Sequence, residues 1–322
     1  MTGKKKNENE EEKKLQKINE LFTIPSEEVK PFINKAREMS WKEFGRKLKA
    51  YYPGRAFPSI SITGEKCEQN CLYCNGHYLK GMKSIESPEA LYDYALKLET
   101  KGGTGMLVSG GYTEEMKLPI EPFLEAIGKI KEETKLKINL HSGLVSKEEA
   151  RALAEANIDI ISYDLIADNK ILEEILRNGK TTKEYIKSME NLLDVGLTVV
   201  PHICLGLYYG TNRGTKEAID QALRYQPPLI VFLTLIPTKG TIMEETPPVG
   251  LDYLSRVLVY TRLKNPKTEQ SLGCMRIRKK EYEKIALATG INRIAVPKSK
   301  TIEKAREKYQ LKIIRNERCC AF

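Results

Sequence analysis

The sequence predicts an α/β protein built on a (β/α)8 TIM-type barrel, full or nearly full, with a helical N-terminal extension and a cysteine-containing C-terminal tail. Three observations predict this fold. Eight short apolar runs rich in β-branched residues follow one another between residues 55 and 298. Amphipathic segments of helical periodicity fill the gaps between them. Alternating strands and helices form parallel βαβ units, and eight such units close a barrel.

The chain begins with a charged segment that is expected to be mostly helical. Residues 1–14 form a lysine and glutamate tract without the apolar core of a secretory signal. Pro25 and the run Ser26-Glu27-Glu28 mark a helix start, and Trp41 is expected to pack this helix onto the body. The three expected domains are the helical extension, the barrel, and a C-terminal helix with the cysteine tail, at residues 1–50, 51–298 and 299–322.

The elements of the barrel are expected in a regular order. The apolar runs predict strands at residues 59–63, 105–109, 136–141, 158–165, 197–207, 229–236, 270–276 and 292–296. The amphipathic segments predict helices at residues 89–101, 120–131, 146–156, 183–195 and 252–262. In such a barrel the chemistry lies on loops at the carboxyl ends of the strands.

Composition and charge restrict the class of protein. No run of about 18 apolar residues occurs, so we expect no membrane span and a cytoplasmic protein. Seven cysteines without an export signal indicate thiols and metal ligands rather than disulfides. The net charge is +10, but lysine and glutamate are mixed along the chain, so an acidic protein partner or an anionic cofactor explains the excess as well as nucleic acid does.

Three cysteines in one short loop are the most informative motif. Cys67, Cys71 and Cys74 follow the first predicted strand, at spacings that place three thiolates together. Three thiolates can hold three irons of a cubane cluster and leave the fourth iron open. A structural zinc site normally has four ligands, and His77 is the local candidate for a fourth, so a zinc knuckle is the alternative.

The order of these cysteines, with Tyr73 just before the last, resembles the signature of radical S-adenosylmethionine (SAM) enzymes. The resemblance implies a [4Fe-4S] cluster on the three thiolates and SAM on its open iron. It also implies that Gly110 and Gly111 lie against the methionine part of SAM, although Tyr112 stands where an acidic residue often follows the glycine pair. The expected cofactor-binding residues are Tyr73, Gly110, Gly111, His141, Ser142, Asp164 and Gly206.

Three of these residues are expected at the site because of their places on predicted strands. His141 and Ser142 end the third predicted strand, where a lone histidine is more often packed than functional, but converging strand ends direct both toward the cofactor. Asp164 interrupts an apolar strand, and a carboxylate there needs polar partners. Ribose hydroxyls are suitable ones.

Four thiols remain after the first group takes three, which is enough for a second cluster. Cys204 and Cys274 lie on predicted strands, and Cys319 and Cys320 stand next to each other near the end of the sequence. A free cysteine is commonly a small buried hydrophobe, but adjacent cysteines in a tail are poor core residues. We therefore expect a metal or reactive role for Cys319 or Cys320. Our hypothesis is an auxiliary [4Fe-4S] cluster on Cys204, Cys274, Cys319 and Cys320, with Arg276 and Arg278 supplying charge or an unusual ligand.

Residues 50–298 resemble the biotin synthase-type branch of radical SAM enzymes. The segment Ile236 to Thr241 resembles the Ile-Pro-x-x-Gly-Thr turn of that branch. Four further segments resemble the split, two-protein lipoyl synthases of archaea and some bacteria, at residues 141–145, 201–204, 272–276 and 319–320.

The resemblance implies a radical SAM sulfurtransferase acting on an octanoyl chain that is attached to a lysine of a carrier protein. Reductive cleavage of SAM would give a 5′-deoxyadenosyl radical that removes hydrogen from the chain, and the auxiliary cluster would supply sulfur. The implied partners are an octanoylated acidic carrier protein or lipoyl domain, a paralogous radical SAM protein and an electron donor such as ferredoxin. The alternatives are biotin synthase or another small-molecule radical SAM enzyme and, from another class, a metal-stabilised RNA-binding protein, for which no RNA-recognition motif is present.

Overall fold

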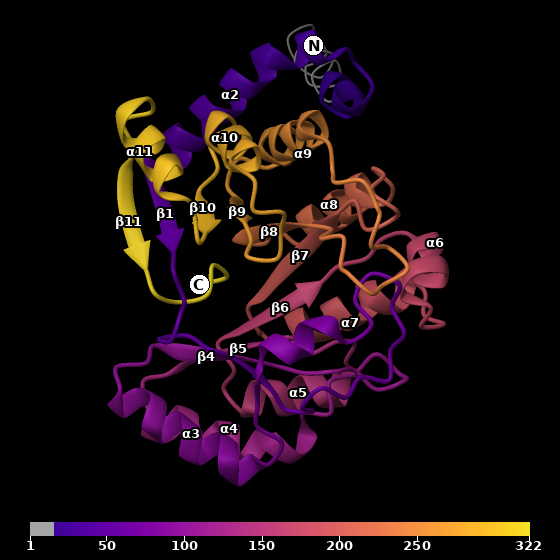
Figure 1. Cartoon of the computed structure of the whole chain (residues 1–322), viewed down its shortest axis with the longest axis vertical. Helices are drawn as coiled ribbons and strands as arrows, with labels where there is room; N and C mark the ends of the chain where they lie inside the picture. The colour runs from indigo at the N-terminus through magenta and orange to yellow at the C-terminus, as the bar shows by residue number, and fades with distance from the viewer. Residues whose placement is uncertain (1–15) are drawn as a thin grey trace, which may run out of the picture.

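The computed structural model describes residues 16–322, so the lysine and glutamate tract at residues 1–14 lies outside the described residues. The described chain forms one sheet of eleven strands, with helices on its outside (Figure 1). Every pair of neighbouring strands is parallel. Parallel sheets are covered on both faces, and here the second face is the inside of the curl.

The strands run in the spatial order β11-β1-β10-β9-β8-β7-β6-β5-β4-β2-β3. Their bounds are β1 Lys47–Tyr51, β2 Ser59–Ser61, β3 Lys83–Ser84, β4 Gly105–Ser109, β5 Lys137–Leu140, β6 Ile160–Asp164, β7 Val199–Leu205, β8 Leu229–Thr234, β9 Glu269–Leu272, β10 Arg293–Ala295 and β11 Lys312–Asn316. The eight predicted strands correspond to β2 and β4 to β10. The predicted strands are confirmed because their apolar runs are buried on both faces.

The helices follow the strands along the chain. Their bounds are α2 Ser26–Phe44, α3 Pro88–Thr100, α4 Leu124–Glu133, α5 Lys147–Glu155, α6 Asn169–Ile171, α7 Thr182–Asp194, α8 Thr215–Arg224, α9 Leu251–Lys264, α10 Lys280–Ala288 and α11 Ser299–Glu307. Short 3-10 or π turns lie at Glu20–Phe22, His77–Gly81, Glu121–Phe123 and Leu172–Leu176. The five predicted helices correspond to α3, α4, α5, α7 and α9.

The expected full or nearly full (β/α)8 barrel needs correction. The sheet is a curled half-barrel whose edge strands are β11 and β3, and in residues 16–322 no strand pairing joins those two edges. Two additional strands extend the sheet on the side away from β2. β1 lies between β10 and β11, pairing Lys49 with Arg293 and with Ile314.

These additional strands were missed for a physical reason. All of β1 except Tyr51 falls within residues 1–50, which were expected to be helical. The strand was missed because its sequence, Lys-Leu-Lys-Ala-Tyr, alternates lysine with apolar residues. β11 falls inside residues 299–322, where only a helix and a tail were expected, and it is an exposed edge strand. Both strands depend on partners far away in the sequence.

The N-terminal helix α2 packs on α9 and α10, outside the sheet. α2 begins at Ser26 after Pro25, as predicted. Trp41 is partly buried and its ring lies 6.4 Å from the ring of Tyr309, so its expected role in packing is confirmed. Arg256 of α9 donates to the main-chain oxygens of Leu21 and Ile24, which fastens the segment before α2.

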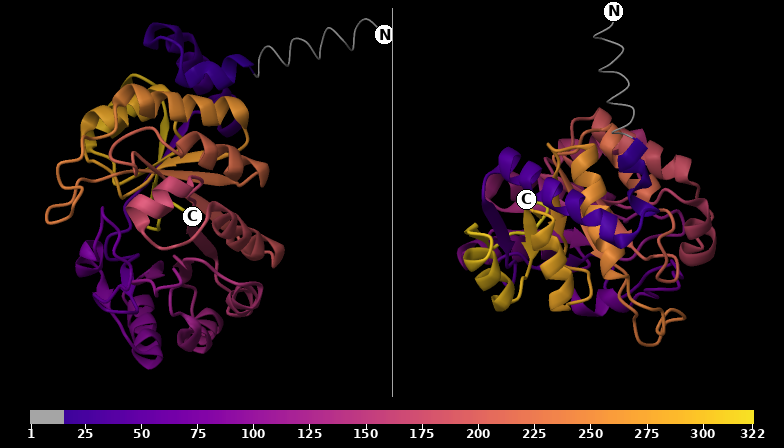
Figure 2. Two further views of the ribbon diagram at one scale, coloured as in Figure 1. Left: turned by 90° about the vertical axis from the view of Figure 1, so that its right-hand side faces the viewer. Right: turned by 90° about the horizontal axis from the view of Figure 1, so that it is seen from above.

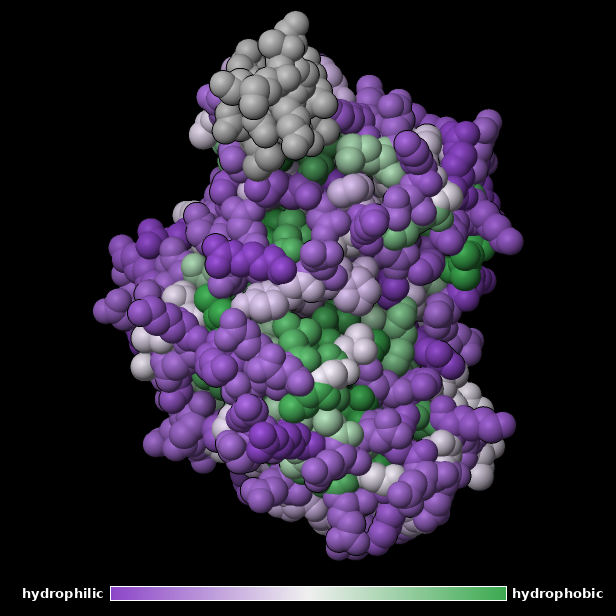
Figure 3. Space-filling view, turned by 180° about the vertical axis from the view of Figure 1, so that it is seen from behind, coloured by the Kyte–Doolittle hydropathy of each residue, from purple (hydrophilic) through white to green (hydrophobic). Residues whose placement is uncertain are grey.

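The last residues turn back into the molecule. After β11 the chain enters the space inside the curl, and the views of Figures 1 and 2 place its end among the strands. Apolar residues gather in the middle of an otherwise hydrophilic surface on the face opposite to that of Figure 1 (Figure 3). In the described part of the chain, no helix is both long and apolar enough to cross a membrane.

Candidate active site

The loop after β2 folds tightly around its cysteines. The main-chain N–H groups of Cys74 and Asn75 both donate to the oxygen of Cys71, at 3.2 and 3.1 Å. Leu72 N–H donates to the oxygen of Ile175 at 2.9 Å, which fastens the loop to the segment after β6. This arrangement directs three thiols to one region, and we call them the first thiol group: Cys67, Cys71 and Cys74.

The first thiol group is coupled electrostatically. Burial, followed by the charges of Cys74 and Cys67, raises the pKa of Cys71 to about 12. Burial also raises the pKa of Cys74. Thiols that disfavour one another's charge are suited to a cationic metal centre, which stabilises thiolates. The chemistry and placement of these donors therefore fit a four-iron cluster bound by three thiolates.

A single metal ion would need a closer arrangement than a cluster does. Among residues 16–322, no group of three histidine, cysteine, aspartate or glutamate side chains is arranged to hold one ion. His77, the fourth ligand of the alternative zinc knuckle, is exposed and its ring packs against Tyr78 at 5.5 Å.

The glycine pair lies directly against the cysteine loop. A Cβ on Gly111 would stand 1.9 Å from the oxygen of Lys66 and 2.6 Å from Cys67 Cα, so only glycine fits. The Gly111 N–H donates to Thr63 Oγ1 at 2.7 Å, and the next residue, Tyr112, donates its N–H to Cys67 Sγ at 3.4 Å. These contacts hold the cysteine loop against the segment that follows β4.

Polar side chains from three neighbouring strands meet inside the curl at their carboxyl ends. His141 Nδ1 lies 3.9 Å from Asp164 Oδ2, and the rings of His141 and His202 are 5.5 Å apart. Burial lowers the pKa of each histidine to about 4, and desolvation by the surrounding protein raises the pKa of Asp164 although half of its side chain is exposed. Neutral imidazoles beside a carboxylate with a half-exposed side chain can form hydrogen bonds with a polar ligand.

Two tyrosines connect this polar group with the first thiol group. Burial raises the pKa of Tyr73 well above its usual value, and the charges of Cys71, Cys74, Asp164 and Cys204 raise it too. Tyr112 is similar, with Asp164 and Cys67 among its charged neighbours. Tyr112 was not predicted as a site residue, although its place directly after the glycine pair was a usable signal.

Two other predicted cofactor residues have local structural partners. Ser142 is 1% exposed and its hydroxyl donates to the Gly143 oxygen at 3.0 Å. Gly206 has φ +76°, and a Cβ there would lie 2.3 Å from Val249 Cγ2. The conformation and crowding at Gly206 explain this glycine without a ligand.

A second set of thiols gathers where the tail returns into the curl. Desolvation by the surrounding protein, followed by the charge of Cys320, raises the pKa of Cys274 to about 11, and a side-chain hydrogen bond with Cys320 lowers the pKa of Cys319. We call these the second thiol group: Cys274, Cys319 and Cys320. Cys274 itself is exposed and follows the end of β9 at Leu272, rather than lying on the strand as predicted.

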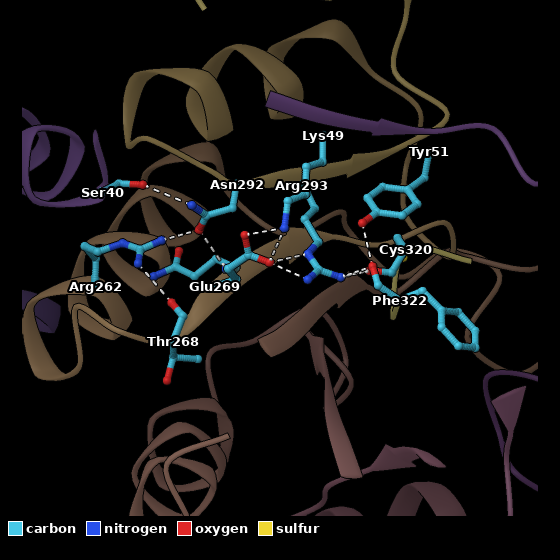
Figure 4. A network of polar contacts seen from close by, with 11 residues as sticks. Ser40, Lys49, Tyr51, Arg262, Thr268, Glu269, Asn292, Arg293, Cys320 and Phe322 are labelled. Carbon is cyan, nitrogen blue, oxygen red and sulfur yellow. Dashed lines mark hydrogen bonds and ion pairs between the residues drawn. The ribbon is translucent and has the colours of Figure 1, made fainter. Parts of the chain in front are cut away.

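Side chains from distant elements hold the tail in this place (Figure 4). Arg293 donates to the main-chain oxygens of Cys320 and Phe322. Tyr51 OH donates to the same Phe322 oxygen at 2.6 Å, and the Phe322 ring packs 5.6 Å from that of Phe57. The tail is therefore fixed by contacts from β1, β10 and the segment before β2.

The thiols of the tail have polar neighbours on the inner face of the sheet. Asn139 Nδ2 donates to Cys319 Sγ at 3.4 Å, and Ser162 Oγ donates to Asn139 at 2.9 Å. Ser271 Oγ is buried and has no hydrogen-bond partner among the nitrogen and oxygen atoms of the described residues, and it lies close to Cys320, whose pKa the hydrogen bond with Cys319 and burial raise well above its usual value. A sulfur-rich group with an unsatisfied hydroxyl nearby fits a bound cluster.

Cys204 is separate from the second thiol group. It lies on the inner face of β7, and burial followed by the charge of Asp164 raises its pKa to about 12. Its partner on β8 is Leu233, and a Cβ on Gly273 would lie 2.4 Å from Leu233 Cδ2. A leucine thus stands between Cys204 and the chain leading to Cys274, about two strand spacings or roughly 10 Å away.

The two arginines named as possible contributors have other partners. Arg276 is buried, donates to the oxygens of Gly273 and Ala295, and pairs with Glu283 at 2.7 Å. Arg278 donates to Val296 O. Sequence reasoning missed Arg293 and Asn139, although each is a polar residue in an apolar strand, which is a signal that a buried partner exists.

Comparisons with known proteins agree with this geometry. The sequence profile of the radical SAM superfamily matches residues 61–225. The biotin synthase of Halorhodospira halophila is 23% identical over 290 residues, covering 85% of this chain and 83% of that protein. The biotin synthase of Campylobacter hominis is 28% identical over 264 residues, covering 78% of this chain and 79% of that protein.

Two solved structures share the fold. A methylornithine synthase superposes with a TM-score of 0.63 at 17% identity, covering 87% of this chain and 81% of that one. The FeFe-hydrogenase maturase from Carboxydothermus hydrogenoformans superposes with a TM-score of 0.66 at 16% identity, covering 91% and 72%. At these identities the likeness concerns the fold alone.

Proposed function

Because the chain belongs to the radical SAM superfamily, we propose that it inserts sulfur at unactivated carbon and forms one component of a two-protein lipoyl synthase. Its substrate would be an octanoyl chain on a lysine of an acidic carrier protein. The likeness to biotin synthases supports sulfur insertion. Lipoyl synthesis rests on the motifs of residues 141–145, 201–204, 272–276 and 319–320.

One observation carries the proposal. The tail brings Cys319 and Cys320 inside the curled sheet beside Cys274, while the first thiol group stands at the end where the strands terminate. An enzyme that only generates a radical needs the first group alone. A second group of thiols in the same interior supplies a place for a sulfur donor within reach of the same substrate.

Different residues of the chain serve the first thiol group, the second thiol group and the substrate. When bound, the cluster with SAM supplies a carbon-centred radical, and the auxiliary cluster supplies sulfur. Thr63 and the glycine pair hold the cysteine loop. His141, His202 and Asp164 offer hydrogen bonds to the polar parts of SAM. Apolar side chains on the inner face, such as Leu233 and Val231, exclude water and accommodate an alkyl chain.

Biotin synthase is a second candidate that the relatives support to a comparable degree. The relatives named above carry that name and are matched over most of their length. Both candidates use a second cluster as the sulfur source, so the second thiol group does not separate them. The substrate does.

The test compares the two substrates on the same protein. Anaerobically reconstituted protein with SAM and dithionite is incubated with an octanoyl-lysine peptide or with a sulfur-free biotin precursor, each with and without a paralogous radical SAM protein. We expect about eight irons per chain and thiolated peptide. Thiolation of the biotin precursor alone would establish the second candidate. SAM cleavage without any thiolated product, at full iron content, would contradict sulfur insertion.

A further inference from the structure

One side of the open end of the sheet is strongly basic. The loop after β9 and the loop after β10 carry exposed cations that flank the exposed Cys274. We call them the basic rim: Arg278, Lys279, Lys280, Lys298 and Lys300. The loops at the opposite side, after β4 and β6, carry mixed charges that include exposed Glu114, Glu115 and Glu173.

The basic rim is one continuous surface although it comes from two loops. Buried Glu283 of α10 accepts from Arg276, from the Lys298 N–H at 3.0 Å and from the Thr301 hydroxyl. Arg278 Nη1 donates to the Val296 oxygen at 3.1 Å. These contacts hold the loop before α10 against the loop before α11, so the cations stand side by side on a rigid base.

Few acids neutralise this surface. Within the described chain, the only ion pair formed by a member of the basic rim is Lys280 with Glu281, at 4.0 Å. A second acid, the exposed Glu303, lies on α11 about one turn beyond Lys300. An array of five cations with a single, long ion pair repels itself, and the repulsion is relieved when an acidic surface binds.

The position of the basic rim suits a substrate delivered by a protein. Cys274, an exposed member of the second thiol group, lies between Leu272 and the start of the basic rim. An acyl chain on a lysine extends well beyond its carrier's surface. The carrier must therefore dock beside the open end while the chain enters, which is where the basic rim stands.

We propose that the basic rim is the docking surface for the acidic carrier domain that presents the acylated lysine. The proposal rests on the proposed function and names the place where its partner binds. Since exposed charges at the edge of an interface act mainly on association rate and salt dependence, the basic rim selects the carrier rather than the acyl chain.

The test reverses two charges of the basic rim and two matched charges elsewhere. The rim variant combines Lys279→Glu with Lys300→Glu, at the start of α10 and in the first turn of α11, where acids suit the helix dipole. The control combines Lys304→Glu with Lys308→Glu, in the last turn of α11 and at its C-cap, where burial and then the charges of Lys308 and Lys284 lower the pKa of Lys304. Both variants change the net charge equally.

Each variant is assayed with an octanoylated lipoyl carrier domain of negative net charge and with an octanoyl-lysine peptide. In the rim variant we expect kcat/KM for the carrier domain to fall at least about tenfold and to lose much of its salt dependence. The peptide reaction should change less than about twofold in either variant.

Three results would overturn the proposal. Equal losses in the rim and control variants would mean that only net charge matters, and an equal loss with the peptide would mean that the variant damaged the site. A rim variant that binds the carrier normally but no longer binds the paralogous radical SAM protein would assign the surface to that partner. If the wild-type protein thiolates neither substrate, direct carrier binding by the two variants still decides the docking surface, while the proposed function fails separately.

Discussion

The two thiol groups of this protein are built in opposite ways. The first is local: its three cysteines lie within one loop that hydrogen bonds to itself, Cys74 and Asn75 to the Cys71 oxygen. The second is assembled from the end of β9 and from the tail, which is held by Arg293, Tyr51 and Phe57. A local group depends on its loop, whereas an assembled group depends on the whole fold.

Because they are built differently, the two thiol groups should be disabled by different kinds of substitution. Loss of one thiol should disable the first group and leave the sheet folded, because the loop contributes little to the core. The second group can be lost without touching any thiol, by releasing the tail from the side chains that hold it. The following changes test this contrast, beginning with the largest expected effect.

Cys71→Ala is expected to abolish the first group's function. Three thiolates are needed for the cluster, so 5′-deoxyadenosine formation should fall at least about a hundredfold, about 2.7 kcal/mol in barrier height. The measurement is 5′-deoxyadenosine released with SAM and dithionite. The second cluster should remain, with about half the iron of the wild type. Release at the wild-type rate would refute the assignment.

Removing both tail thiols, Cys319→Ala with Cys320→Ala, is expected to stop sulfur insertion while SAM cleavage continues. The tail contributes little of the core, so the sheet and the first cluster should survive. Iron, sulfide and thiolated product are measured together. Full iron and sulfide in this variant would show that the tail binds no cluster, and thiolated product after cluster loss would rule out the donor role.

Arg293→Gln is expected to empty the second group with every thiol still in place. The Arg293 guanidinium also pairs with Glu269, whose side chain is 10% exposed, so the change should lower the free energy of unfolding by about 3 kcal/mol. Lys49→Gln is the matched control, because Lys49 pairs with Glu269 at 2.8 Å but does not hold the tail. Thermal unfolding with iron counts distinguishes them: selective iron loss in both variants would mean that stability alone controls loading.

Cys204→Ala is expected to have the smallest effect on the clusters. Leu233 and the β8 strand separate this thiol from Cys274, and its charged neighbour is Asp164. Iron and sulfide contents should equal those of the wild type, measured on protein purified without oxygen. Loss of about four irons would restore Cys204 as a ligand and would break the contrast between a compact second group and a solitary thiol.

The strand pattern of the sheet was predictable, and its closure was not. The apolar runs that became β2 and β4 to β10 are buried whatever lies beside them, so periodicity finds them. β1 and β11 read as a polar helix end and a tail, because each becomes a strand only through its neighbour, as Leu48 does opposite Ile313. A strand that forms only beside a partner far away in the sequence has no recognisable hydrophobic pattern in its own residues.

By itself the sequence determined the first thiol group, the glycine pair and the series of strands, since each depends on residues within a few positions of one another. Only the tertiary structure decided that Cys319 and Cys320 lie beside Cys274 and that Cys204 does not. Arg293 and Tyr51 hold the tail in its position inside the sheet, and Leu233 stands beside Cys204 on the neighbouring strand. Distances across a curled sheet follow from strand order and register, and these are properties of the whole chain.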